Sequence, residues 1–108
     1  MNCNISENAD FHIIALSGDV DLSSSPQARK AILQSLEKGH VMVDLSAVNY
    51  IDSSGVAGLV EGYQTAKERA VKFGLIGVSP SALQVLQLAH LDRVFTLHNT
   101  LDDALANG

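Results

Sequence analysis

Short apolar runs alternate along the chain with longer segments of helical periodicity. The run Phe11–Gly18 is rich in β-branched residues and predicts a strand, with a weaker strand before it across a polar turn. Val41–Leu45 and Leu75–Val78 predict buried strands, and Arg93–His98 predicts a last one. Because strands alternate with helices, the pattern indicates an α/β fold with a mixed sheet of four to five strands.

About four helices are expected to pack on this sheet. In the first, we expect Ser25 to be the N-cap, Pro26 the first helical residue and Gly39 a left-handed residue at the end. Its buried stripe recurs every fourth residue and consists of Ala28, Ile32 and Leu36.

The second helix has the clearest pattern. Apolar residues follow a 3.6-residue period from Ser54 to Phe73, and Gly74 is expected to end it. Ser79-Pro80 marks the start of a third helix, and Thr100 with Asp103 predicts a capping box for a short terminal helix.

Composition narrows the function classes. The 108 residues favour one domain, 1–108, and 46% hydrophobic against 18% charged residues indicate a folded chain. A net charge of -5 disfavours nucleic-acid binding, which needs a basic face. One cysteine cannot form an internal disulfide. From the N-terminal residues and the short apolar runs we expect neither a leader nor a membrane-spanning segment. We therefore expect a cytoplasmic domain without membrane insertion, and no cofactor is implied.

Two polar segments stand where predicted strands end and helices begin: Asp19–Ser25 and Asp52–Gly55. Functional sites of α/β folds gather at such places, where helix N-termini favour anions. The plain interpretation is a helix cap, but a cap needs one side chain and Asp-Ser-Ser supplies three. We expect Gly55 to leave the neighbouring hydroxyl open, and Gly58 and Gly62 to let the helix pack closely on the sheet.

Several chemistries fit the second segment poorly. A hydrolase elbow needs glycine two residues before the serine, and a phosphate-binding loop needs lysine and more glycines. Asp19, Asp21 and Asp52 could imitate a phosphoaspartate receiver, but Ser79 and His98 stand where its lysine belongs. We therefore expect no catalytic residue and no metal site. A phosphoacceptor serine remains, because the helix dipole and free N–H groups would offset a phosphate that a docking partner would meet.

The chain resembles a known family across nearly its whole length. "VDLSAVNYIDSSGVAGL" resembles the signature of STAS domains, most closely that of bacterial anti-sigma factor antagonists. "LSGDVDLSSS" resembles the family's Leu-x-Gly-acid-apolar-Asp segment, and "GLIGVSPSALQVLQLAHLDRVFTL" resembles its later strand-helix-strand unit. The resemblance implies a STAS-like single domain.

The resemblance also implies a function. An anti-sigma factor with an ATP-binding kinase fold would phosphorylate Ser53, the serine directly after the aspartate. The unphosphorylated protein would bind that factor and free the sigma factor for transcription. Ser54 would be a second acceptor or the helix cap. The residues expected at the partner-binding surface are Asp21, Ser23, Ser24, Asp52, Ser54 and Gly55.

One departure leaves a second function open. Many antagonists carry an acidic or bulky helix after the motif, whereas Gly58, Gly62 and Tyr63 give this one a smoother face. The alternative is the small STAS subunit of a lipid-transport ABC system, in which the domain binds the transporter ATPase and phosphorylation is not required.

Overall fold

The computed structural model describes residues 1–107. It contains five strands and four helices. In chain order they are β1 (Asn2–Asn8), β2 (Phe11–Val20), α1 (Ser25–Leu36), β3 (His40–Ile51), α2 (Ser53–Arg69), β4 (Phe73–Ile76), α3 (Pro80–Leu88), β5 (Thr96–His98) and α4 (Leu101–Asn107).

The strands form one mixed sheet in the order β1-β2-β3-β4-β5. β1 runs antiparallel to β2, and the other neighbours are parallel. The weak N-terminal strand is therefore real, and it pairs along its full length from Asn2 opposite Ser17 to Asn8 opposite Phe11. The predicted α/β class, with a mixed five-stranded sheet and four helices, is confirmed.

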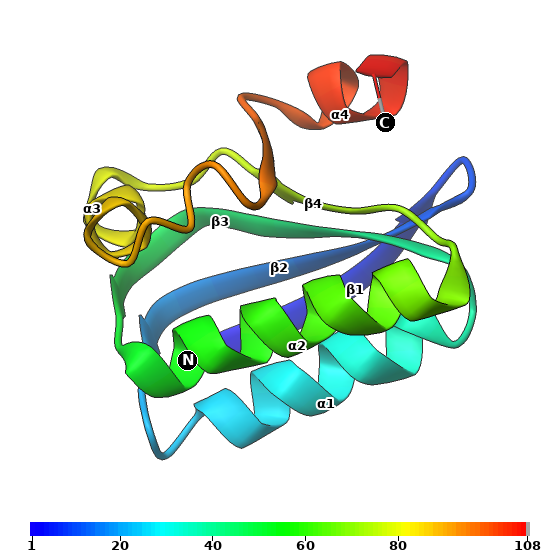
Figure 1. Cartoon of the computed structure of the whole chain (residues 1–108). Helices are drawn as coiled ribbons and strands as arrows, with labels where there is room; N and C mark the ends of the chain where they lie inside the picture. Colours follow the sequence, from blue (N-terminus) through cyan, green and yellow to red (C-terminus); the bar gives the residue numbers. More distant parts are fainter. Residues whose placement is uncertain (108) are drawn as a thin grey trace.

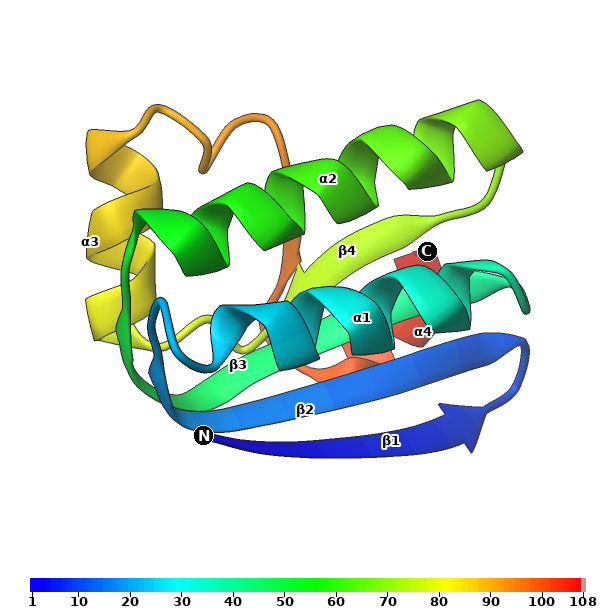
Figure 2. The same cartoon turned by 90° about the horizontal axis from the view of Figure 1, so that it is seen from below.

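The helices cover the sheet unequally (Figures 1 and 2). α1 and α2 lie side by side on one face, α4 lies against the opposite face, and α3 sits beside the far end of β3. The larger core lies under α1 and α2 and includes Ile14, Leu16, Val43, Leu45 and Leu75. A smaller cluster lies under α4 and consists of Phe11, Ile13, Met42, Ile76 and Ala104. No helix of residues 1–107 combines the length and apolarity needed to cross a membrane.

β2 and β3 are longer than the sequence pattern predicts. β3 continues past Leu45 to Ile51, with Val48 and Ile51 buried. Its pairing with β4 ends at Asp44, whereas its pairing with β2 continues until Ile51 lies opposite Val20. These two strands therefore extend beyond the rest of the sheet and bring the starts of α1 and α2 to the same end of the molecule (Figure 2).

The ends of α1 differ from expectation. Its N-cap residue is Ser24, and Ser25 is the buried first residue of the helix. The helix ends before Glu37, whose backbone is right-handed, and Gly39 has a φ of +153° instead of the expected left-handed helical value. The chain needs Gly39 for the turn into β3, and not as the last residue of the helix.

The end of α2 is also earlier than predicted. Ala70 adopts the left-handed conformation, with φ +58°, and closes the helix. Phe73 and Gly74 belong to β4, so the predictions that Phe73 is helical and that Gly74 ends the helix are wrong. A Cβ on Gly74 would lie 2.9 Å from the sulfur of Met42, so the glycine permits close packing within the sheet.

The later strands are correspondingly displaced. β4 ends at Ile76, two residues before the predicted end, and β5 includes only the last three residues of the predicted run. The two later helix starts are confirmed. The Ser79 hydroxyl accepts a hydrogen bond from the Ala82 N–H, and the Thr100 hydroxyl accepts one from the Asp103 N–H.

Candidate functional site

The two polar segments meet at the extended ends of β2 and β3. The N–H of Asp52 donates a hydrogen bond to the carbonyl of Val20, at 3.1 Å. This bond joins the residue before α2 to the last residue of β2. The loop from Asp21 to Ser24 therefore lies beside the start of α2, as both cartoon views show (Figures 1 and 2).

Asp52 is the N-cap of α2. Its Oδ1 accepts hydrogen bonds from the backbone N–H groups of Ser54, at 2.9 Å, and Gly55, at 3.2 Å. It also accepts the Ser54 hydroxyl, at 2.5 Å. The hydrogen bond from the Ser54 hydroxyl lowers the pKa of Asp52 most, and the two N–H groups lower it further. Loss of hydration and, to a smaller extent, the charge of Asp21 oppose this lowering. The hypothesis that a serine hydroxyl caps this helix is wrong, because the carboxylate already has that role.

Ser53 differs from Ser54 in its surroundings. Ser53 is the first residue of α2 and is exposed, and within residues 1–107 its hydroxyl has no hydrogen-bond partner. Ser54 is partly buried, and its hydroxyl is held by Asp52. Only one of the two adjacent hydroxyls therefore projects freely into solvent.

The loop before α1 is organised in the same way. Oδ1 of Asp21 accepts the Ser23 hydroxyl at 2.7 Å and the N–H groups of Ser23 and Ser24 at 3.1 and 3.2 Å. The Ser24 hydroxyl accepts the N–H of Asp21 at 3.0 Å. The hydrogen bond from the Ser23 hydroxyl is the main cause of the lowered pKa of Asp21. Two carboxylates, each fixed by its own turn, thus stand at one end of the molecule.

Gly55 serves packing, not access to a hydroxyl. It is buried, and a Cβ there would lie 2.7 Å from Cγ1 of Ile51 and 2.9 Å from Cγ1 of Val20. A side chain would push the start of α2 off the two strand ends. The expectation that Gly55 keeps the neighbouring serine open is wrong, because the space that a side chain at Gly55 would occupy is filled by Ile51 and Val20 and not by a serine hydroxyl.

The next two glycines face different neighbours. A Cβ on Gly62 would lie 2.7 Å from Cγ2 of Ile32 and 3.0 Å from the ring of Phe73, so close packing is confirmed against both α1 and the sheet. A Cβ on Gly58 would meet only Arg29, at 3.6 Å from its Cβ. Gly58 therefore faces α1 at an ordinary packing distance. The prediction that it packs against the sheet is wrong.

An open depression of about 370 Å³ lies between α1 and α2 next to the site. Its residues are Ser25, Pro26, Arg29, Ser54, Ala57, Gly58 and Glu61. Across it, the Arg29 guanidinium donates to both carboxylate oxygens of Glu61, with Nη2 at 2.7 Å from Oε1. The pair raises the pKa of Arg29 and lowers that of Glu61. No sequence pattern paired these two residues, since they lie on separate helices.

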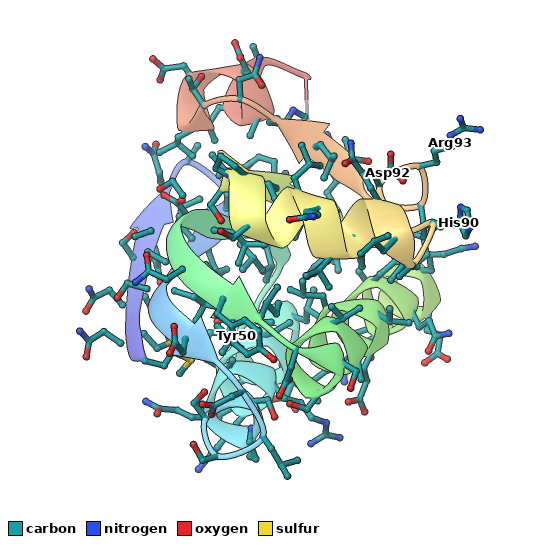
Figure 3. All side chains as sticks on the ribbon, turned by 90° about the vertical axis from the view of Figure 1, so that its left-hand side faces the viewer. Tyr50, His90, Asp92 and Arg93 are labelled. Atoms are coloured by element: carbon teal, nitrogen blue, oxygen red, sulfur yellow. The ribbon has the colours of Figure 1, made fainter. Side chains whose placement is uncertain are left out.

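Two exposed apolar residues at this end were also absent from the predicted site. Leu22 is 77% exposed in the loop before α1, and Tyr50 is 51% exposed near the end of β3. Figure 3 shows Tyr50 beside the start of α2 and apart from His90, Asp92 and Arg93, which lie on the loop after α3. The sequence signal that could have identified them is a large side chain with apolar surface in or next to a polar segment: Leu22 lies within Asp19–Ser25, and Tyr50 lies two residues before Asp52.

The site has the parts of a recognition surface. Ser53 has no histidine or lysine beside it in sequence. The carboxylate of the neighbouring Asp52 already accepts hydrogen bonds from the N–H groups of Ser54 and Gly55. Within residues 1–107, no three His, Cys, Asp or Glu side chains gather as a metal site requires. The surface presents the free hydroxyl of Ser53 at the end of the molecule where the two fixed carboxylates, Asp21 and Asp52, also lie.

Comparison with known proteins agrees with this architecture. The family model described as "STAS domain" matches residues 2–104. An anti-sigma-B factor antagonist of Listeria monocytogenes is 24% identical over 102 residues, which cover 92% of this chain and 90% of that protein.

Solved structures share the fold. An anti-sigma factor antagonist from Mycobacterium paratuberculosis is 29% identical, with a TM-score of 0.87 over 97% of this chain and 91% of that one. The Bacillus cell fate determinant SpoIIAA, solved in its phosphorylated form, is 19% identical with a TM-score of 0.77 over 97% of each chain. The chain belongs to the STAS domain family, and the relatives named here include bacterial anti-sigma factor antagonists.

Proposed function

We propose that this protein is an anti-sigma factor antagonist controlled by phosphorylation of Ser53. In the unphosphorylated state it binds an anti-sigma factor of kinase fold and thereby permits sigma-factor-dependent transcription. That factor then phosphorylates Ser53 with ATP, and the complex dissociates. The observation that carries the proposal is the exposed, unbonded hydroxyl of Ser53 at the start of a helix whose cap is a neighbouring aspartate.

The local hydrogen bonds favour Ser53 over Ser54 as the acceptor. A kinase must reach the hydroxyl oxygen and align it with the γ-phosphate. Ser53 offers this oxygen without breaking a hydrogen bond of the protein. Ser54 would first have to leave Asp52 and turn out of a partly buried position.

The phosphate would act mainly through its charge. It adds about -1.5 to -2 near two carboxylates whose pKa values are already lowered. The N–H groups of Ser54 and Gly55 are taken by Asp52, so the helix start neutralises the phosphate less than free N–H groups would. A partner that tolerates the two acids would have to desolvate a third and larger charge.

The domain itself should keep its fold after phosphorylation. The Ser53 side chain takes part in none of the hydrogen bonds that hold the start of α2, and it lies in solvent. The known relatives support a binding role: one is an antagonist by name, and SpoIIAA, of the same fold, has been solved in a phosphorylated form. We infer that the protein has no enzymatic activity of its own.

The acceptor can be identified directly. Wild type, Ser53→Ala and Ser54→Ala are incubated with the cognate anti-sigma kinase and ATP, and the phosphorylated residue is located by mass spectrometry. We expect phosphate on Ser53, its loss in Ser53→Ala and its retention in Ser54→Ala. Phosphate mainly on Ser54 would overturn the residue assignment. No phosphate at all, with binding to a transporter ATPase instead, would favour the ABC-transport subunit.

The effect on binding is measured with the same kinase. Ser53→Ala should bind like wild type, because it removes a hydroxyl without a protein partner. Ser53→Asp should weaken binding by roughly 5- to 20-fold, in the lower part of the usual range of regulatory couplings. Melting temperatures of all variants show whether each is folded. Undiminished binding by a folded Ser53→Asp would contradict the electrostatic switch.

A further inference from the structure

We propose that Leu22 and Tyr50 are the apolar anchors of the surface that docks on the anti-sigma factor, with Ser53 beside them. The inference rests on the proposed function and adds to it the residues that hold the partner. It follows from the exposure of the two side chains, their fixed backbone and the charges around them.

Leu22 and Tyr50 stand out among the exposed apolar residues. Within residues 1–107, the exposed large apolar side chains also include Ile5 on β1, Leu88 on α3, Val94 in the loop before β5 and Leu97 in β5. Single exposed apolar residues are common and need no explanation. Leu22 and Tyr50 are different because each lies within two residues of one of the site's two carboxylates, Asp21 and Asp52.

Both side chains are held on fixed backbone. Leu22 lies in the loop closed by the hydrogen bonds of Asp21 with Ser23 and Ser24. Tyr50 is in β3, paired in register with Asp19 of β2, and the next residue, Ile51, is buried. The bond from Asp52 to Val20 joins the two segments. A surface that is already ordered loses less entropy on binding than a flexible one, and tyrosine is enriched among residues that dominate binding energy.

The surrounding charges define the partner. Asp19, Asp21 and Asp52 adjoin the two anchors, and neither Asp19–Ser25 nor Tyr50–Gly58 contains a lysine or arginine. The complementary face must present an apolar socket for each anchor, with cationic groups between them. We assign this face to the anti-sigma factor, because the anchors are contiguous with the serine that it phosphorylates.

The arrangement also explains why one phosphate would be effective. Apolar anchors contribute to binding only when water is removed from the surface around them. A phosphate on Ser53 would stand at the same end of the molecule and retain its own hydration. Docked anchors and a phosphate on Ser53 would then exclude one another without a change of fold, so the complex would separate once the phosphate has been transferred.

The test compares Tyr50→Ala and Leu22→Ala with a matched control, Leu88→Ala. Leu88 is 76% exposed, almost as much as Leu22, but lies at the end of α3. Kd for the unphosphorylated proteins and the cognate anti-sigma factor is measured by calorimetry, and Tm is measured for each. We expect Kd to rise about tenfold or more for Tyr50→Ala and about fivefold or more for Leu22→Ala. Leu88→Ala should stay within about twofold, and every Tm should stay near that of wild type.

The outcomes separate the two proposals. If wild type binds and is released by Ser53 phosphorylation, but both anchor variants bind as tightly as wild type, the anchors are wrong and the proposed function stands. An equal loss in Leu88→Ala would also overturn the assignment of these particular anchors. If wild type binds no anti-sigma factor, the proposed function fails and the anchors fail with it.

Discussion

Among single residues, Asp52 holds the start of α2, since its carboxylate accepts two N–H groups and one hydroxyl there. Replacement by alanine removes the cap of the longest helix. We expect Asp52→Ala to lower Tm by about 4–8 °C at pH 7, the usual effect of losing an N-cap in a domain of this size. Asp52→Asn is the control, because asparagine caps about as well as aspartate. An unchanged Tm in Asp52→Ala would show that the cap does not stabilise α2.

The same carboxylate gives a pH dependence. The pKa of Asp52 is lowered in the folded protein, chiefly by the Ser54 hydroxyl. Its stabilisation is therefore complete above the unfolded-state pKa of about 3.9 and is lost as the pH falls through the lower folded-state value. The Tm difference between wild type and Asp52→Ala should be constant from about pH 5 to 8 and shrink below about pH 4. A difference that grows on acidification would contradict this assignment.

At this scale the sequence predicts the two polar segments that meet in the structure, but not the roles of the residues within them. Aspartate and serine are both preferred at helix N-caps, so residue preference alone cannot decide which of Asp52, Ser53 and Ser54 caps the helix. The roles depend on side-chain direction, which only the folded turn determines. The sequence could not show that Gly55 packs against strand ends, because β3 was predicted to stop six residues early.

At the scale of elements, α2 contains a natural pair of test positions four residues apart. Gly58→Ala should raise the free energy of unfolding by up to about 1 kcal/mol, because alanine favours helix and its Cβ meets Arg29 at an ordinary distance. Gly62→Ala should lower it by about 1–2 kcal/mol, because its Cβ would overlap Ile32 and the rigid ring of Phe73. Urea unfolding measures both changes. Stabilisation by Gly62→Ala would show that α1 moves aside easily.

Element boundaries mark the limit of periodicity. Ala66, Ala70 and Phe73 continue the helical spacing, yet Ala70 is left-handed and Phe73 is in β4. Alanine carries no signal for a left-handed turn, and Phe73 is buried in either assignment. β3 was predicted to end too early for a related reason. Beyond Asp44 the strand pairs with β2 alone, and its buried residues, Leu45, Val48 and Ile51, recur at every third position instead of forming a continuous apolar run.

At the scale of the whole molecule, the two faces of the sheet are covered by different numbers of helices, with α1 and α2 packed on one face and α4 on the other. Within residues 1–107, the face opposite α1 and α2 is covered by α4, whose Ala104 is fully buried in the cluster with Phe11, Ile13 and Met42. Ala104→Asp would bury a charge there and should detach α4, lowering Tm and increasing binding of a dye specific for exposed apolar surface. Ala106→Asp, on an exposed position of the same helix, is the control. Equal behaviour of the two variants would show that α4 contributes nothing to the fold.

The hydrogen bonds that hold the start of α2 join Asp52 to Val20, Ser54 and Gly55, and the side chain of the proposed acceptor Ser53 takes part in none of them. If Ser53 carries the phosphate, adding or removing it requires no unfolding and leaves no conformational trace. The active and inactive states would then differ only in the presence of the phosphate. The lifetime of each state would be set by the enzymes that add and remove the phosphate. Every molecule could pass through many such cycles.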